Sequence, residues 1–103
     1  HCLIVDDEIS TGGTLIEAAN FLEKHGASSV QACATHPVLA GPAMERIMAS
    51  NLKEVVVCDS IPVTERIAAA KAGSKIKVLP LASLFAKAIR RIHDGDSISR
   101  LFR

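Results

Sequence analysis

The fold is decided by the stretch at residues 2–14, CLIVDDEISTGGT, in which a short apolar run leads into two carboxylates and a glycine-rich loop. Residues 2–5 are too few for a helix and rich in strand-forming types, which predicts a buried strand. A helical pattern begins at about Gly13. This order is typical of a site for a phosphorylated ligand, because glycines let backbone N–H groups approach a phosphate and a helix N-terminus adds unpaired donors.

The residue types around the loop narrow the chemistry of the ligand. The G-x-G-x-x-G pattern of dinucleotide loops is absent, and no lysine follows Gly12 and Gly13 as in a Walker A loop. Asp6 and Asp7 would repel a phosphate, so we expect them to face either vicinal sugar hydroxyls or a Mg²⁺ shared with a diphosphate. Ribose 5-phosphate satisfies both halves of the site. Its diol would lie on the aspartates, and its phosphate would lie on Ser10, Thr11, Gly12, Gly13 and Thr14.

The same residues also have a plainer interpretation. Ser10 and Thr11 are good helix caps, and a Gly-Gly pair is a common turn. Two adjacent carboxylates at the end of a strand are unfavourable, however, unless something binds them. We therefore favour the ligand site, and we assign no role to Glu8.

Three stretches resemble a known family. Residues 5–14, VDDEISTGGT, resemble the phosphoribosyl-diphosphate (PRPP) motif of type I phosphoribosyltransferase folds. Residues 34–43, ATHPVLAGPA, and residues 88–102, AIRRIHDGDSISRLF, are similar to stretches of the ribose-phosphate pyrophosphokinases, which share that fold. The resemblance implies an α/β domain, namely the C-terminal half of a phosphoribosyltransferase-like protein with a mostly parallel sheet flanked by helices.

The resemblance also implies an activity. Ribose-phosphate pyrophosphokinases make PRPP and AMP, a step of nucleotide biosynthesis, by transferring the diphosphate of MgATP to C1 of ribose 5-phosphate. Asp6 and Asp7 would hold the ribose, with Mg²⁺ as cofactor and the same two aspartates as its candidate ligands. The family's charge-stabilising Lys and Arg lie in an upstream loop, so we expect no catalytic residue and no turnover from this chain alone. In some members the Ser-x-Ser tail, here Ser97 and Ser99, contributes to a phosphate or ADP effector site between subunits, and members form homo-oligomers.

Two alternatives stay open. A nucleobase phosphoribosyltransferase, which consumes PRPP, shares the first stretch but does not explain the other two. A non-catalytic regulatory relative that assembles with a PRPP synthetase would keep the fold.

Composition limits the other function classes. The 103 residues suit one small domain, which we expect to be a C-terminal part of a longer chain because it opens at its own site strand. A net charge of +1 and 3% aromatic residues argue against nucleic acid as a partner. No apolar run approaches the length of a membrane span. The three cysteines lack the spacing of a disulfide framework, which suggests reduced thiols in a cytosolic protein. Cys33 and His36 have C-x-x-H spacing but lack further metal ligands.

The rest of the chain alternates between strand and helix patterns. We expect strands at residues 29–35, 54–58 and 76–79, and helices at 13–25, from Pro42 to about 49, and at 82–93. Residues 64–72 fit either a helical turn or a loose excursion, and 97–102 fit an extended tail. This alternation predicts a parallel sheet with helices on its faces. Ligands bind at the C-terminal ends of such strands, so the turns after Asp6, Thr35 and Asp59 should share one rim.

Overall fold

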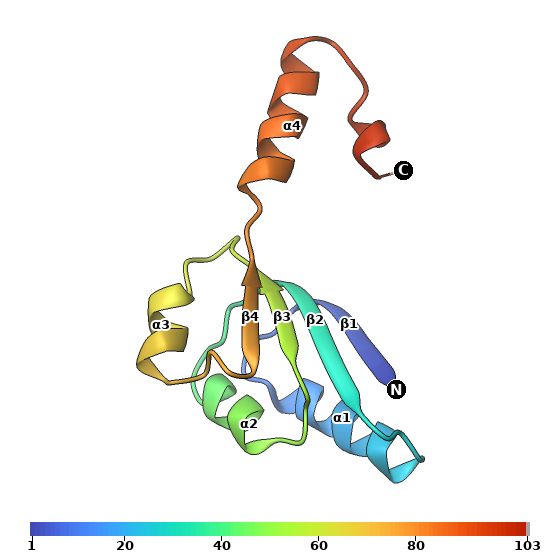
Figure 1. Cartoon of the computed structure of the whole chain (residues 1–103), viewed down its shortest axis with the longest axis vertical. Helices are drawn as coiled ribbons and strands as arrows, with labels where there is room; N and C mark the ends of the chain where they lie inside the picture. Colours follow the sequence, from blue (N-terminus) through green and yellow to red (C-terminus); the bar gives the residue numbers. More distant parts are fainter. Residues whose placement is uncertain (103) are drawn as a thin grey trace.

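The computed structural model describes residues 1–102, which are built around one parallel sheet of four strands (Figure 1). The strands lie side by side in sequence order and are β1 (Cys2–Glu8), β2 (Val30–His36), β3 (Val55–Cys58) and β4 (Ile76–Leu79). The expected strands are confirmed to within one residue at β2, β3 and β4. β1 runs three residues beyond its apolar run, so the two aspartates belong to the end of the strand.

The helices also follow the sequence pattern. They are α1 (Gly13–Lys24), α2 (Ala43–Ala49), α3 (Thr64–Ala69) and α4 (Ala82–His93). The expectation of an extended tail is wrong, because η1 (Ile98–Phe102) is a 3₁₀ helix. Its turn is started locally: the hydroxyl oxygen of Ser97 accepts the backbone N–H of Ser99 at 3.2 Å, a side-chain bond that favours a turn over extended chain.

All three inner helices lie on one face of the sheet. Each strand is followed by the neighbouring parallel strand in the same direction, so right-handed crossovers place α1, α2 and α3 on the same side. There they bury an aliphatic core with residues of β2, β3 and β4. The core comprises Ile9, Leu15, Ala19, Val30, Ala32, Ala34, Leu39, Ala43, Met44, Ile47, Leu52, Val55, Val57, Val63, Ile67, Ala72 and Ile76.

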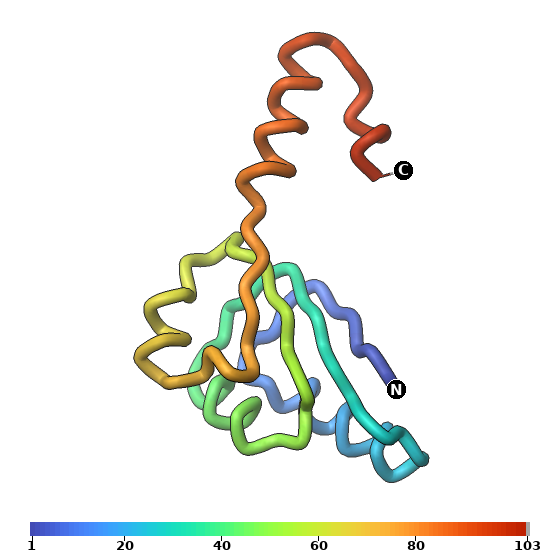
Figure 2. Tube along the Cα trace, viewed as in Figure 1, coloured from blue at the N-terminus to red at the C-terminus, as the bar shows by residue number. Residues whose placement is uncertain are grey.

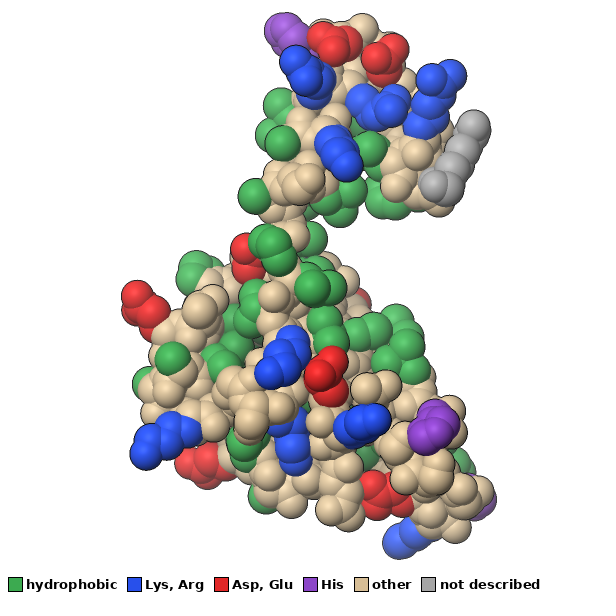
Figure 3. Space-filling view, viewed as in Figure 1, with side chains coloured by type: hydrophobic (Ala, Val, Ile, Leu, Met, Phe, Trp, Pro, Cys, Tyr) green, Lys and Arg blue, Asp and Glu red, His purple; other side chains and the backbone are tan. Residues whose placement is uncertain are grey.

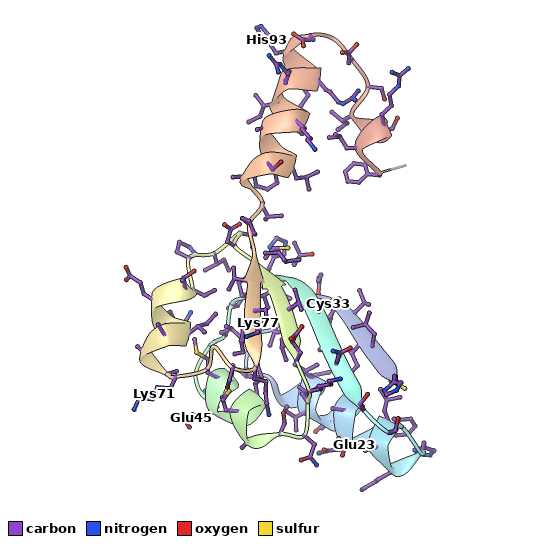
Figure 4. The ribbon with its side chains drawn as sticks, in the orientation of Figure 1. Glu23, Cys33, Glu45, Lys71, Lys77 and His93 are labelled. Carbon is purple, nitrogen blue, oxygen red and sulfur yellow. The ribbon has the colours of Figure 1, made fainter. Side chains whose placement is uncertain are left out.

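The opposite face of the sheet is open. No helix lies in front of the strands in Figure 1, and hydrophobic side chains gather over them in Figure 3. Leu3 and Val5 are 61% and 72% exposed, so the expectation that β1 is buried is wrong. The reason is the strand order, which does not reverse within residues 1–102 and therefore sends no crossover to this side. Cys33 and Lys77, labelled in Figure 4, lie on this open face.

The last helix projects away from the sheet. Figure 2 shows the chain leaving the end of β4 and running outward through α4 before it turns back into η1. No residue of α4 is buried. Its start is tied to the sheet by Asp59, whose carboxylate accepts the backbone N–H of Leu81 at 2.8 Å. Within residues 1–102, no helix combines the length and the apolar character needed to cross a membrane.

Candidate functional site

A pocket of about 230 Å³ opens where β1 ends and α1 begins. Six of the seven residues that the first sequence motif assigns to the ligand line this one cavity: Asp6, Asp7, Ser10, Thr11, Gly12 and Thr14. Gly13, the seventh, does not line it and lies beside it as the first residue of α1. Glu8, Ile9 and Leu15 complete the lining.

The backbone of the loop has its carbonyl oxygens turned to the protein. Those of Ile9 and Ser10 accept the N–H groups of Leu39 and Ala40 at 2.9 and 2.8 Å, and that of Thr11 accepts Nη1 of Arg46 at 3.0 Å. In a planar trans peptide the N–H points opposite to the preceding carbonyl. The N–H group of each following residue therefore points away from the group that donates to the carbonyl oxygen before it.

Those N–H groups make up a candidate anion cradle. Among residues 1–102, no backbone N–H between residues 10 and 14 has an acceptor within the protein. The first-turn N–H groups of a helix have no intrahelical partner, and the positive end of the helix dipole lies beside them. A phosphate group has the charge and the number of acceptor oxygens to take several of them at once.

The two glycines differ in what a side chain would meet. Gly12 has φ 83°, in the left-handed region that side chains disfavour. At Gly13 a Cβ would lie 3.3 Å from Nη1 of Arg46, a close contact with the end of a flexible side chain. The plainer interpretation of the motif, a hydroxyl cap, is wrong because α1 has no side-chain hydrogen bond at its N-cap.

The two aspartates lie exposed on the rim of the pocket. One oxygen of Asp6 accepts the N–H of Asp7, and one oxygen of Asp7 accepts the N–H of Glu8, each at 2.8 Å. Hydrogen bonding with the Asp6 carboxyl group lowers the pKa of Asp7 most, followed by the Glu8 N–H, while the charge of His36 adds a smaller effect. Asp7 is therefore anionic at neutral pH, the state in which a carboxylate accepts sugar hydroxyls.

The carboxylates at this rim suit a magnesium ion that is shared with a ligand better than an ion held by protein ligands alone. Residues 1–102 contain no group of three or more His, Cys, Asp or Glu side chains arranged around a common point. Mg²⁺ in phosphate sites is commonly held by one or two carboxylates, with waters and substrate phosphates completing its octahedron. Asp6 and Asp7 supply carboxylates of this kind beside the candidate anion cradle.

The three strand-end turns meet at one edge, as the parallel sheet predicts. Nδ1 of His36 lies 2.7 Å from the hydroxyl oxygen of Ser60, which donates to the carbonyl oxygen of Thr35 at 3.3 Å. The carbonyl oxygen of His36 in turn accepts the N–H of Ile9 at 3.1 Å. These bonds connect the ends of β1 and β2 with the turn after β3.

The tail serines lie at a different place. Ser97 and Ser99 share a hydrogen bond of 2.7 Å between their hydroxyl oxygens, and Nη1 of Arg91 donates to the carbonyl oxygen of Ser97 at 3.2 Å. They lie beside a second hollow of about 310 Å³ between α4 and the tail, lined by Lys87, Arg90, Arg91, Asp94, Asp96 and Leu101.

Comparison with known proteins shows the family of the chain. The family model described as the phosphoribosyl synthetase-associated domain matches residues 1–103. The chain belongs to that family. It is 54% identical to a ribose-phosphate pyrophosphokinase of Caldanaerobacter subterraneus subsp. tengcongensis and 52% identical to one of Helicobacter hepaticus, each over 97% of this chain and 30% of the relative. The family resemblance carried by the three motifs is thus confirmed.

A solved structure shares the fold. The phosphoribosylpyrophosphate synthetase of Mycobacterium smegmatis superposes with a TM-score of 0.82 at 38% identity, covering 91% of this chain and 30% of that one. The phosphoribosyltransferase-like α/β assignment is therefore confirmed. The chain spans about 30% of the length of these relatives.

Proposed function

We propose that the protein carrying this chain is a ribose-phosphate diphosphokinase, and that the chain supplies its ribose 5-phosphate site. The observation that supports this most is the joint lining of one pocket by anionic carboxylates and by a loop of unpaired N–H groups. The hydroxyl groups of a sugar phosphate suit the carboxylates, and its phosphate suits the N–H groups. The relatives' names, ribose-phosphate pyrophosphokinase, describe a transferase that acts on such a ligand.

The two halves of the site bind different parts of the ligand. The N–H groups and hydroxyls of Ser10, Thr11 and Thr14 bind the 5-phosphate together with Gly12 and Gly13. Asp6 and Asp7 accept hydroxyl groups of the ribose, which orients the C1 hydroxyl toward a diphosphate donor. Transfer of this type depends on positioning and on neutralising phosphate charge. Mg²⁺, held by Asp6 or Asp7 with the substrates, would supply that neutralisation.

Further parts of the proposal concern the rest of the molecule. The products are PRPP and AMP from MgATP, and the enzyme acts in the cytoplasm as a homo-oligomer. The chain forms one domain within a longer polypeptide, as its 30% share of the relatives' length suggests. The catalytic cations lie outside it, so the chain alone is inactive. Ser97 and Ser99 serve an anionic effector beside Arg91.

The test is AMP formation by the full-length protein. With MgATP, AMP should appear only when ribose 5-phosphate is present, and Asp6→Asn should abolish most of it. The matched control is Glu17→Gln, an equal loss of charge at an exposed position of α1 outside the pocket. Consumption of PRPP with a nucleobase, without AMP formation, would favour a phosphoribosyltransferase. No activity in either assay would favour a non-catalytic protein that assembles with a synthetase.

A further inference from the structure

Arg46 of α2 reaches to the back of the glycine-rich loop. Its Nη1 donates to the carbonyl oxygen of Thr11 at 3.0 Å, between positions 35 residues apart. The same atom lies 3.3 Å from where a Cβ on Gly13 would stand. The guanidinium group is thus packed against the loop on both sides of Gly12, and the missing side chain of Gly13 leaves room for it.

This contact decides which way one peptide group faces. The carbonyl oxygen of Thr11 is held toward α2, so the N–H of Gly12 points to the opposite side. A glycine-rich loop otherwise samples many conformations, and ordering it when a ligand binds would cost affinity. A bond that sets the peptide in advance removes part of that cost.

The helix that carries Arg46 is firmly fixed. Ala43 and Ile47, on either side of it, are fully buried in the core, and Met44 is 9% exposed. Ala43 also packs beside Gly12, with its Cα 3.5 Å from the position of a Cβ there. The guanidinium group therefore extends from a rigid base and not from a mobile loop.

We propose that Arg46 is a positioning residue of the phosphate site, holding the Thr11–Gly12 peptide so that the loop N–H groups face an incoming phosphate. Its positive charge behind the loop further favours a dianion. Arg46 does not line the pocket, so it acts through the loop and not by contact with the ligand. The identity of the ligand rests on the proposed function; the bracing of the loop does not.

A second arginine, Arg66, binds the segment that is hydrogen-bonded to this loop. The guanidinium group of Arg66 on α3 donates to the carbonyl oxygens of Val38 and Leu39, and the N–H of Leu39 in turn bonds Ile9. The loop is thus held directly at Thr11 by Arg46 of α2, and indirectly at Ile9 by Arg66 of α3 through Leu39. Arg46 is the nearer of the two, because its own carbonyl partner is in the loop.

The test uses the full-length protein with Arg46→Met, Arg46→Lys and the control Lys53→Met. Lys53 is an exposed cation outside the pocket, so its change to methionine removes the same charge elsewhere. Steady-state kinetics give KM for ribose 5-phosphate, KM for MgATP and kcat. The backbone mobility of ¹⁵N-labelled Gly12 and Gly13 is measured by NMR relaxation without ligand.

Arg46→Met should raise KM for ribose 5-phosphate about tenfold, the loss expected for one hydrogen bond from a charged donor. KM for MgATP and kcat should stay within about twofold, Arg46→Lys should recover part of the loss, and Lys53→Met should behave as wild type. The backbone mobility of Gly12 should increase in Arg46→Met. Unchanged mobility at Gly12, or equal losses in both KM values, would overturn the proposal. If the wild type does not use ribose 5-phosphate, the proposed function fails, and the mobility of Gly12 alone still decides the role of Arg46.

Discussion

Replacing Gly12 by alanine should loosen the start of α1, whereas the same change at Gly13 should not. At Gly12, with φ 83°, a side chain costs about 1–2 kcal/mol. Its Cβ would lie 3.5 Å from the Cα of Ala43, an ordinary contact that adds no clash. Gly13 has helical backbone, where alanine is favoured by up to about 1 kcal/mol. The one close contact of its Cβ would be with the flexible end of Arg46, which gives way by a small shift.

Native-state hydrogen exchange of the α1 amides in the full-length protein measures this difference directly. Gly12→Ala should speed their exchange about 5- to 30-fold, the factor that corresponds to 1–2 kcal/mol. Gly13→Ala should leave the exchange unchanged or slow it by up to about fivefold, and so serves as the matched control. Equal effects of the two substitutions, or a larger effect at Gly13, would refute the conformational argument for Gly12.

Three further predictions follow from burial, charge and hydrogen bonding. Ile47 is fully buried, so Ile47→Val should lower the free energy of unfolding by about 0.5–1.5 kcal/mol and Ile47→Ala by about 2–5 kcal/mol, and equal losses in denaturant unfolding would contradict close packing. The folded state lowers the pKa of Asp7, so its ionised form stabilises the fold above the ordinary pKa of 3.8, and this contribution is lost as pH falls through the lowered pKa. A carbon-detected NMR titration in which Asp7 titrates above 3.8 would contradict this direction of the pH dependence. Asp59→Ala removes the acceptor for the N–H of Leu81, so exchange at Leu81 should accelerate several-fold while β4 amides stay unchanged; a Leu81 rate equal to wild type would show that the bond does not hold α4.

The parts of the site that are local in sequence could be predicted, and the parts that depend on distant contacts could not. Residues 5–14 carry the whole cradle within one strand end and one helix start, so their spacing alone indicated a sugar-phosphate site. Arg46 gave no such signal, because its partner in the loop is 35 positions away. Its role became visible only when α2 was placed beside α1.

The open face of the sheet was missed for a related reason. Alternating strands and helices predict a parallel sheet, but which face each helix covers depends on the order of the strands. Here the order never reverses within residues 1–102, so Val5 and Leu3 face outward although their apolar run is typical of a buried strand. The tail was missed because the hydroxyl oxygen of Ser97 accepts the N–H of Ser99, a local bond that favours a turn over the weak strand pattern of residues 97–102.

A crystal structure of the full-length protein with ribose 5-phosphate would test the central claim most directly. We expect the 5-phosphate within hydrogen-bonding distance of the N–H groups of Gly12, Gly13 and Thr14, and the ribose hydroxyls on the carboxylates of Asp6 and Asp7. A sugar phosphate bound at another place, or bound in this pocket with its phosphate away from the loop, would contradict the account.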